Sequence, residues 1–289
     1  MSKETLKGRY AIITGSSRGL GYAIAEAYLK AGANVIITGT DEALLTHSQQ
    51  TLKKAKAHKN QGLGYSVTNV QFDDDIDLLL KNALKVFPKI DIVVNNAGVY
   101  GPIGEFETNN WDDWVKSIEV NLLGTAYMCH QILPHMKKNG GGKIINLSGG
   151  GATKGTPNFS AYAASKAAIV RFTECLALET GKDHIDINAI APGALNTRLL
   201  DQVIQEGVEK VGPERYTEAL VQRKTGGDPL TKAADLAVFL GSPASDGITG
   251  KLISAQHDPW GTVEFKAENL TPQDYTLRRY TPPKKDLGF

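Results

Sequence analysis

The stretch Thr14-Gly15-Ser16-Ser17-Arg18-Gly19-Leu20-Gly21 joins an apolar run, Tyr10–Thr14, to a helix predicted over Tyr22–Ala31. A second apolar run, Asn34–Thr38, follows that helix. Strand, glycine-rich turn, helix and strand together predict a β-α-β unit. Glycines let the backbone turn tightly and approach a ligand, and N–H groups at a helix start bind phosphate. The spacing Gly-x-x-x-Gly-x-Gly differs from the commonest dinucleotide fingerprint, so a turn with no ligand is the alternative.

The rest of the chain repeats this alternation. Apolar runs predict further strands at 64–70, 91–94, 143–147, 185–190 and 251–254. Helices are predicted at 41–59, 73–86, 111–136, 162–178, 198–225 and 231–240. The pattern is typical of an α/β fold, a single doubly wound Rossmann-type domain with a parallel sheet and helices on both faces. We expect this domain to span 1–255, and the polar, proline-containing stretch 256–289 to form an irregular C-terminal extension.

Composition narrows the class of protein. The 289 residues are 41% hydrophobic and 22% charged with a net charge of +1, as in ordinary globular proteins. Such a balance gives no strong field for nucleic acid or an anionic membrane. The first ten residues are polar and lack an apolar signal core, so we expect a cytoplasmic protein. We expect Cys129 and Cys175 to be two buried thiols that form neither a disulfide nor a metal site.

Tyr162 and Lys166 lie four residues apart in a predicted helix, so they share one face of it. A free tyrosine has a pKa of about 10, and a nearby cation lowers it. Such a phenol is able to give a proton to a carbonyl oxygen, or take one from an alcohol, near neutral pH. A chance Tyr-x-x-x-Lys on a helix is the alternative that the rest of the chain must exclude.

The chain resembles the short-chain dehydrogenases/reductases, which are NAD(P)-dependent oxidoreductases. The resemblance covers roughly residues 7–254 and depends on five motifs in the family's order. These are TGSSRGLG at 14–21, NNAG at 95–98, Asn121 in VNLLG, Tyr162 with Lys166, and Ala191-Pro192-Gly193 through Thr197. Each motif is weak alone, but the shared order and spacing make chance agreement very improbable.

The resemblance implies roles for these residues. Tyr162 would be the general acid/base, Lys166 would lower its pKa and bind the nicotinamide ribose, and Asn121 would hold a water in a proton relay. Ser148 would polarise or position the substrate oxygen. No metal is implied. The cofactor-binding set would be Gly15, Ser17, Arg18, Gly19, Leu20, Gly21, Thr40, Asn69, Val70, Asn96, Ala97, Gly98, Tyr162, Lys166, Pro192, Gly193, Leu195 and Thr197.

The catalytic serine departs from the family's pattern. That serine usually lies thirteen residues before the tyrosine, where this chain has Gly149. Ser148 lies one position earlier. Either the following loop carries an extra residue, or Ser148 is structural; we favour a catalytic Ser148, with Thr153 a more distant choice.

Cofactor preference depends on the end of the second strand. An acidic residue there favours NAD, and a basic one accommodates the 2′-phosphate of NADP. This chain has Gly39 and Thr40 at those positions, so neither signal is present. Arg18 matches a second NADP-associated position and is charge-complementary to a phosphate. We therefore expect NADP(H) to be preferred over NAD(H), although Asp41 remains able to reach a ribose.

The substrate is less defined. The family's variable substrate loop corresponds to a lid at about 198–228, which mixes apolar and charged residues. A polyol, sugar or nucleotide-linked sugar is favoured, and a 3-oxoacyl-type reductase is the alternative. A nucleotide-binding regulator or scaffold without turnover is the alternative from another class. The family also implies a homodimer or homotetramer through the helices at 111–136 and 162–178. The C-terminal extension would cover the substrate pocket or a neighbouring subunit, or simply wrap the surface.

Overall fold

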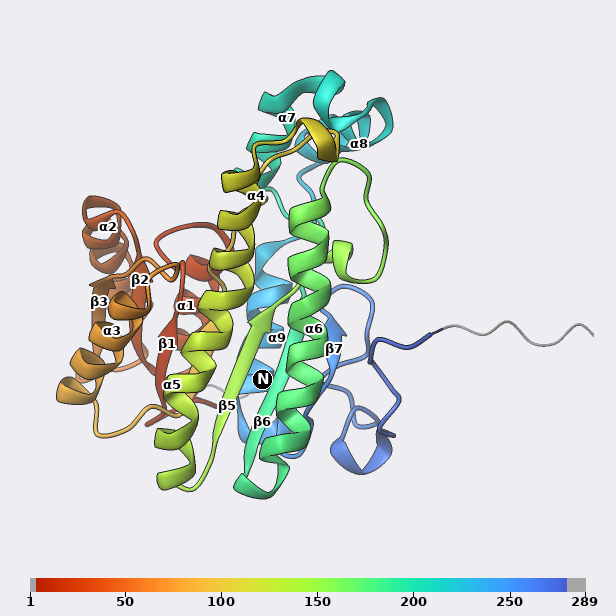
Figure 1. The fold of residues 1–289 in the computed structure, drawn as a ribbon. Coiled ribbons are helices and arrows are strands. Elements are labelled where there is room, and N and C mark those ends of the chain that lie inside the picture. The colour runs from red at the N-terminus through yellow and green to blue at the C-terminus, as the bar shows by residue number, and fades with distance from the viewer. Residues whose placement is uncertain (1–3, 280–289) are drawn as a thin grey trace, which may run out of the picture.

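A parallel sheet of seven strands runs through residues 4–279, the part of the chain that the computed structural model describes (Figure 1). Its strand order is β3-β2-β1-β4-β5-β6-β7. The strands are β1 (Tyr10–Ile13), β2 (Asn34–Gly39), β3 (Leu63–Val67), β4 (Ile92–Asn95), β5 (Gly142–Leu147), β6 (Ile185–Ala191) and β7 (Leu252–Ser254). This arrangement confirms the predicted doubly wound α/β fold.

Helices cover both faces of the sheet, as Figure 1 shows for α5 and α6 in front of the strands and α1 and α9 behind them. The helices are α1 (Gly19–Lys30), α2 (Glu42–Leu52), α3 (Asp73–Val86), α4 (Trp111–Ile118), α5 (Gly124–Lys138), α6 (Ser160–Thr180), α7 (Arg198–Val211), α8 (Pro213–Thr225) and α9 (Leu230–Gly241). Successive strand side chains point to opposite faces. Ile13 therefore packs in the core with α1 and α9, and Ile12 in the core with α3 and α5. Because both faces are buried along the five central strands, these strands are largely apolar runs, whereas the edge strand β3 is half-buried.

The order of the strands reverses between β1 and β4, which pair side by side although β2 and β3 come between them in sequence. In sheets of this kind, ligands bind in the crevice at the carboxyl ends of the strands, where the order reverses. The glycine turn after β1 and the loop after β4 both begin at that edge. The topology therefore brings the sequence motifs to one end of the sheet.

Several predicted boundaries were wrong, among them that of the helix expected over 41–59, which ends at Leu52. The lid region, expected to be one helical stretch over 198–225, is two helices, because Gly212 between them has φ +87°. Its backbone leaves the helical range in a conformation that glycine adopts without strain. The third strand ends at Val67 rather than at Val70, because the Asn69 side chain accepts the Gln71 N–H and turns the chain.

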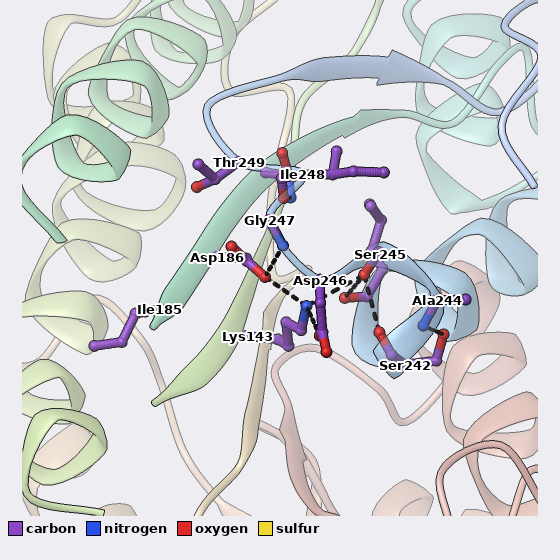
Figure 2. A network of polar contacts seen from close by, with 12 residues as sticks. Lys143, Ile185, Asp186, Ser242, Ala244, Ser245, Asp246, Gly247, Ile248 and Thr249 are labelled. Atoms are coloured by element: carbon purple, nitrogen blue, oxygen red, sulfur yellow. Dashed lines mark hydrogen bonds and ion pairs between the residues drawn. The ribbon is translucent and has the colours of Figure 1, made fainter. Parts of the chain in front are cut away.

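A polar network joins the amino ends of two strands, opposite the end of the sheet that carries the sequence motifs (Figure 2). The ammonium of Lys143, at the start of β5, lies 2.5 Å from Asp186 at the start of β6 and 2.7 Å from Asp246. Asp186 also accepts the Gly247 N–H at 3.1 Å. Since Asp246 and Gly247 belong to the connection between α9 and β7, the network ties the segment before the last strand to the starts of β5 and β6.

The described part of the extension, 256–279, is irregular apart from a single 3₁₀ turn, Ala267–Asn269; residues 280–289 lie outside the described residues. It packs along β7, where the Leu252 N–H donates to the Tyr275 carbonyl at 2.7 Å. It also reaches α6, where Glu174 accepts the Leu277 N–H at 2.7 Å. Phe265 is buried with the core on the α1 side. The extension thus covers the edge of the sheet.

The two thiols differ. Cys129 is buried, as predicted, whereas Cys175 is exposed, so the prediction of two buried thiols was wrong. Cys175 lies off the stripe of α6 that faces the core, which carries Val170, Thr173 and Ala177. In residues 4–279 no helix combines the length and the apolarity that crossing a membrane requires.

Candidate functional site

A cavity of about 1990 Å³ opens at the carboxyl ends of the strands, below α7 and α8. Thirteen predicted site residues line it: Arg18, Gly19, Leu20, Gly21, Asn96, Gly98, Ser148, Tyr162, Lys166, Pro192, Gly193, Leu195 and Thr197. The other predicted residues do not line it: Gly15, Ser17, Thr40, Asn69, Val70, Ala97 and Asn121. The structure therefore brings both ends of the predicted site, the glycine turn and the tyrosine–lysine pair, into one space.

The glycine turn is packed too closely for any other residue at two positions. A Cβ on Gly15, which has φ +60°, would lie 2.8 Å from the Ala97 Cα. A Cβ on Gly21 would lie 2.5 Å from both the Asn96 side chain and the Gly15 carbonyl oxygen. The turn leads into α1, and the Arg18 side chain does not cap that helix. N–H groups of the first helical turn are thus available to an anion in the cavity.

Thr14 holds this turn against the loop after β4. Its hydroxyl accepts the N–H groups of Asn96 and Ala97, each at 3.0 Å. In return, the Asn96 side chain donates to the carbonyls of Thr14 and Gly15, each at 2.9 Å. Sequence reasoning did not single out Thr14, although its place at the end of a strand before a glycine was a usable signal.

The side chain of Tyr162 is half-buried and lines the cavity. Its ring packs edge-on against Tyr100, with the centroids 4.5 Å apart. Burial raises the pKa of Tyr162 above its usual value, the Tyr100 phenol raises it further, and Arg215 lowers it. We expected Lys166 to lower this pKa, but in the free protein burial is the dominant effect. The phenol is accordingly protonated at neutral pH.

Lys166 lies beside Tyr162, with its ammonium 5.7 Å from the centre of the ring. The ammonium donates to the Leu147 carbonyl at 2.8 Å, which fixes its position at the end of β5. Burial lowers the pKa of Lys166 to about 8. The lysine therefore titrates close to the physiological range.

Asn121 lies in a single π-helical turn, Glu119–Leu123, between α4 and α5. Its side chain accepts the Val99 N–H at 2.8 Å and donates to the Val99 carbonyl and to the Ser165 hydroxyl, each at 2.9 Å. Turns of this kind recur at functional sites. Here the asparagine fastens the loop after β4 to α6, directly behind Tyr162 and Lys166.

Ser148 and Gly149 face different neighbours. The buried Ser148 hydroxyl donates to the Lys166 carbonyl at 3.2 Å. A Cβ on Gly149 would lie 2.8 Å from the Tyr162 hydroxyl oxygen. The residue facing the phenol is thus Gly149, and the Ser148 hydroxyl is hydrogen-bonded to the backbone of α6.

We expect Gly149→Ala to lower kcat at least about 10-fold, because the new methyl group must displace the Tyr162 hydroxyl. Ser148→Ala should change kcat less than about 3-fold while lowering the free energy of unfolding by about 1 kcal/mol, the usual worth of one hydrogen bond. Steady-state kinetics and urea denaturation of both variants test this pair. The reverse ranking of the two kcat losses would restore Ser148 as the catalytic serine.

The end of β2 carries no acidic side chain directed to a ribose. Gly39 is the last residue of the strand, and Thr40 after it is exposed. The Asp41 carboxylate caps α2 by accepting the Leu44 N–H at 2.9 Å. Arg18 is exposed in the glycine turn. Within residues 4–279, no cluster of three or more His, Cys, Asp or Glu side chains is arranged to coordinate a metal ion.

Comparison with known proteins agrees with this geometry. The family model for short chain dehydrogenase matches residues 9–207. A Caenorhabditis elegans dehydrogenase/reductase SDR family member 4 is 34% identical, over 86% of this chain and 93% of its own. A D-beta-hydroxybutyrate dehydrogenase from Cupriavidus necator is 32% identical, over 86% and 96%.

Among solved structures, a gluconate 5-dehydrogenase from Burkholderia cenocepacia, in complex with NADP and tartrate, is 27% identical. It superposes with a TM-score of 0.75 and covers 87% of this chain and 95% of that one. The match to the family model spans more than half of the chain and includes the glycine turn, Tyr162 and Lys166. The chain belongs to the short-chain dehydrogenases/reductases.

Proposed function

We propose that this protein is an NADP(H)-preferring oxidoreductase that interconverts a secondary alcohol and a carbonyl compound, with Tyr162 as the general acid/base. The observation that carries the proposal is the single cavity that joins the glycine turn to Tyr162. The nicotinamide supplies or accepts the hydride when the cofactor is bound. Tyr162 gives a proton to the carbonyl oxygen during reduction and takes it back from the alcohol during oxidation.

The other site residues would bind and orient the cofactor and the water of the proton relay. The first turn of α1 would hold the pyrophosphate through its N–H groups. Lys166 would bind the nicotinamide ribose, and the 192–197 loop would hold the carboxamide. Asn121 would keep the water relay in place through the loop that it fastens. We propose a positioning role for Ser148, because its hydroxyl is bonded to the Lys166 carbonyl.

The preference for NADP(H) is supported by two features of the adenosine end. Arg18 is exposed in the turn, where a guanidinium is able to bind a 2′-phosphate. Asp41, the one candidate for binding an unmodified ribose, already caps α2.

We expect Arg18→Leu to weaken NADPH binding about 10- to 100-fold, since a hydrogen bond to a charged group contributes about 1.5–3 kcal/mol. Binding of NADH should change less than about 3-fold. Titration of the purified protein with each cofactor, followed by nicotinamide fluorescence, measures both constants, and Lys30→Leu at the far end of α1 is the matched control. Tighter binding of NADH than NADPH by the wild type would reverse the cofactor preference; binding of neither would favour the scaffold alternative.

We propose a polyol, a sugar or a nucleotide-linked sugar as the substrate class, with a 3-oxoacyl compound as the alternative. The charged residues that α7 and α8 contribute to the cavity support the first choice. Two of the similar proteins are named for gluconate and for hydroxybutyrate, both of which are hydroxy acids. We further propose a cytoplasmic homodimer or homotetramer. Exposed Trp111, at the start of α4, and Leu178, on α6, offer apolar surface for such an assembly.

A further inference from the structure

Arg215 brings a positive charge to the reacting end of the cavity. It lies in the first turn of α8, which Figure 1 shows above the amino-terminal end of α6. Its side chain lines the same cavity as Tyr100 and Tyr162. Residue 215 is more than fifty positions from Tyr162 in the chain, so no sequence motif linked the two.

The guanidinium acts on both phenols of the aromatic pair. It lines the cavity with Tyr100 and lowers the pKa of that phenol, against a larger upward effect of burial. It also lowers the pKa of Tyr162. The rings of Tyr100 and Tyr162 are in contact, with centroids 4.5 Å apart. The positive charge of Arg215 therefore belongs to the same cavity as the proton donor, Tyr162.

The charge of Arg215 is only weakly neutralised by the protein. Among residues 4–279, Glu218 is the one carboxylate that forms an ion pair with it, at 3.3 Å, and the Glu218 side chain is 61% exposed. An exposed pair of this kind contributes little. Four other acids line the cavity. Asp201 pairs with Arg223, Asp228 accepts the Ala194 N–H, Asp258 accepts the Ser254 N–H, and Glu214, the residue before Arg215, forms no ion pair with it. A guanidinium has five N–H donors, and Glu218 accepts from one of its nitrogens.

We propose that Arg215 binds a carboxylate of the substrate, so that the substrate is a hydroxy acid in oxidation and the corresponding oxo acid in reduction. The proposal rests on the proposed dehydrogenase function. In oxidation, the carbinol C–H leaves as a hydride to NADP⁺, the O–H proton passes to the ionised Tyr162 oxygen, and the C=O bond forms. The carboxylate takes no part in this change. It fixes which carbon faces Tyr162.

A carboxylate fits this position better than a phosphate or a thioester does. The planar guanidinium matches a carboxylate in bidentate geometry, and the two charges are equal in size. A phosphate monoester carries about −1.5 to −2 charges, more than the single charge of Arg215 balances. A 3-oxoacyl thioester has no charge near its reacting carbon, so it would leave Arg215 paired with the exposed Glu218 alone.

Binding to an inactive variant tests the proposal without turnover. In Tyr162→Phe saturated with NADP⁺, calorimetry compares gluconate with glucitol, and 3-hydroxybutyrate with butane-1,3-diol. We expect at least one acid to bind about 10- to 100-fold more tightly than its neutral partner. Adding Arg215→Met should abolish that difference. Failure of both acids to bind, equal binding of acid and neutral partner, or an advantage that survives Arg215→Met would overturn the proposal.

Turnover separates a binding role from a structural one. Arg215→Met should lower kcat/KM for the acid about 10- to 100-fold, chiefly through KM, and leave the neutral partner unchanged. Arg215→Lys should recover part of the loss because it keeps the charge. Lys210→Met, which removes an exposed cation on α7 outside the cavity, is the control. An equal loss with both substrates would show a structural role instead.

Failure of the proposed dehydrogenase function would give a different result from failure of the proposed role of Arg215. If the wild type bound neither NADPH nor NADH, the dehydrogenase function itself would fall. If it bound the cofactor and oxidised glucitol or butane-1,3-diol in preference to the acids, the function would stand and the role of Arg215 would fall.

Discussion

Replacing Tyr162 by Phe is expected to lower kcat by about 10²–10⁴-fold, the usual contribution of a positioned general acid/base. Binding of NADPH should remain within about 3-fold of the wild type, because the substitution removes one hydroxyl and keeps the ring that packs on Tyr100. Single-turnover kinetics and a fluorescence titration on the same preparation measure the two effects. A variant that kept most of its turnover would contradict the assignment of Tyr162 and favour a protein that binds nucleotide without catalysis.

The direction of the Tyr162 pKa shift predicts how the wild type responds to pH. Burial raises this pKa, so the phenol stays protonated through the neutral range. Reduction, which uses the phenol as the donor, should be independent of the phenol's ionisation near pH 7. Oxidation requires the phenolate, and its kcat/KM should rise with pH into the alkaline range, a rise that Tyr162→Phe should abolish. A rate of oxidation that is flat from pH 7 to alkaline values would show that bound cofactor or substrate returns the pKa to neutrality.

Replacing Lys166 by Met should lower activity without lowering stability. We expect kcat/KM to fall at least about 10²-fold, because the position beside Tyr162 loses its cation. The free energy of unfolding at pH 7 should not fall. Burial lowers the pKa of Lys166 from 10.5 to about 8, so at pH 7 the folded state holds a charge that its surroundings disfavour. A shift of that size corresponds to roughly 3 kcal/mol, offset in part by the hydrogen bond to Leu147.

The sign of this effect also follows from proton linkage. Between pH 8 and pH 10.5 the unfolded chain binds more protons at Lys166 than the folded chain does. Stability from this group therefore rises with pH across that window and reaches its full value above the unfolded pKa. Urea denaturation of wild type and Lys166→Met at several pH values should show this rise in the wild type and its reduction in the variant.

Lys143→Met is the matched control. Lys143 is also buried, but it lies at the amino ends of the strands, between Asp186 and Asp246. Removing this cation leaves Asp186, whose side chain is 14% exposed, without its ion-pair partner, and we expect a loss of about 3 kcal/mol in stability, the lower end of the range for a buried pair. Activity per folded molecule should remain. A loss of stability in Lys166→Met as large as that in Lys143→Met would contradict the separation of roles.

The fold followed from local patterns in the chain. The five central strands were visible as short apolar runs because both faces of the sheet are buried there, and helices fill the intervals between the strands. The glycine turn, NNAG, Asn121, and Tyr162 with Lys166 were recognisable because each needs particular residues at fixed spacing. Packing explains two glycines of the turn directly, because a Cβ at Gly15 or Gly21 would meet neighbouring atoms.

Only the tertiary structure decided which groups from distant parts of the chain approach one another. Gly149 rather than Ser148 faces the Tyr162 hydroxyl, because the loop after β5 turns the serine toward the Lys166 carbonyl. Tyr100, from the loop after β4, packs on the Tyr162 ring, and Arg215, from α8, lines the same cavity and lowers the pKa of Tyr162. Burial, which sets the pKa directions of Tyr162 and Lys166, is a property of the packed molecule. Residue spacing encodes contacts within one element, whereas the charge around Tyr162 depends on which elements the fold places above it.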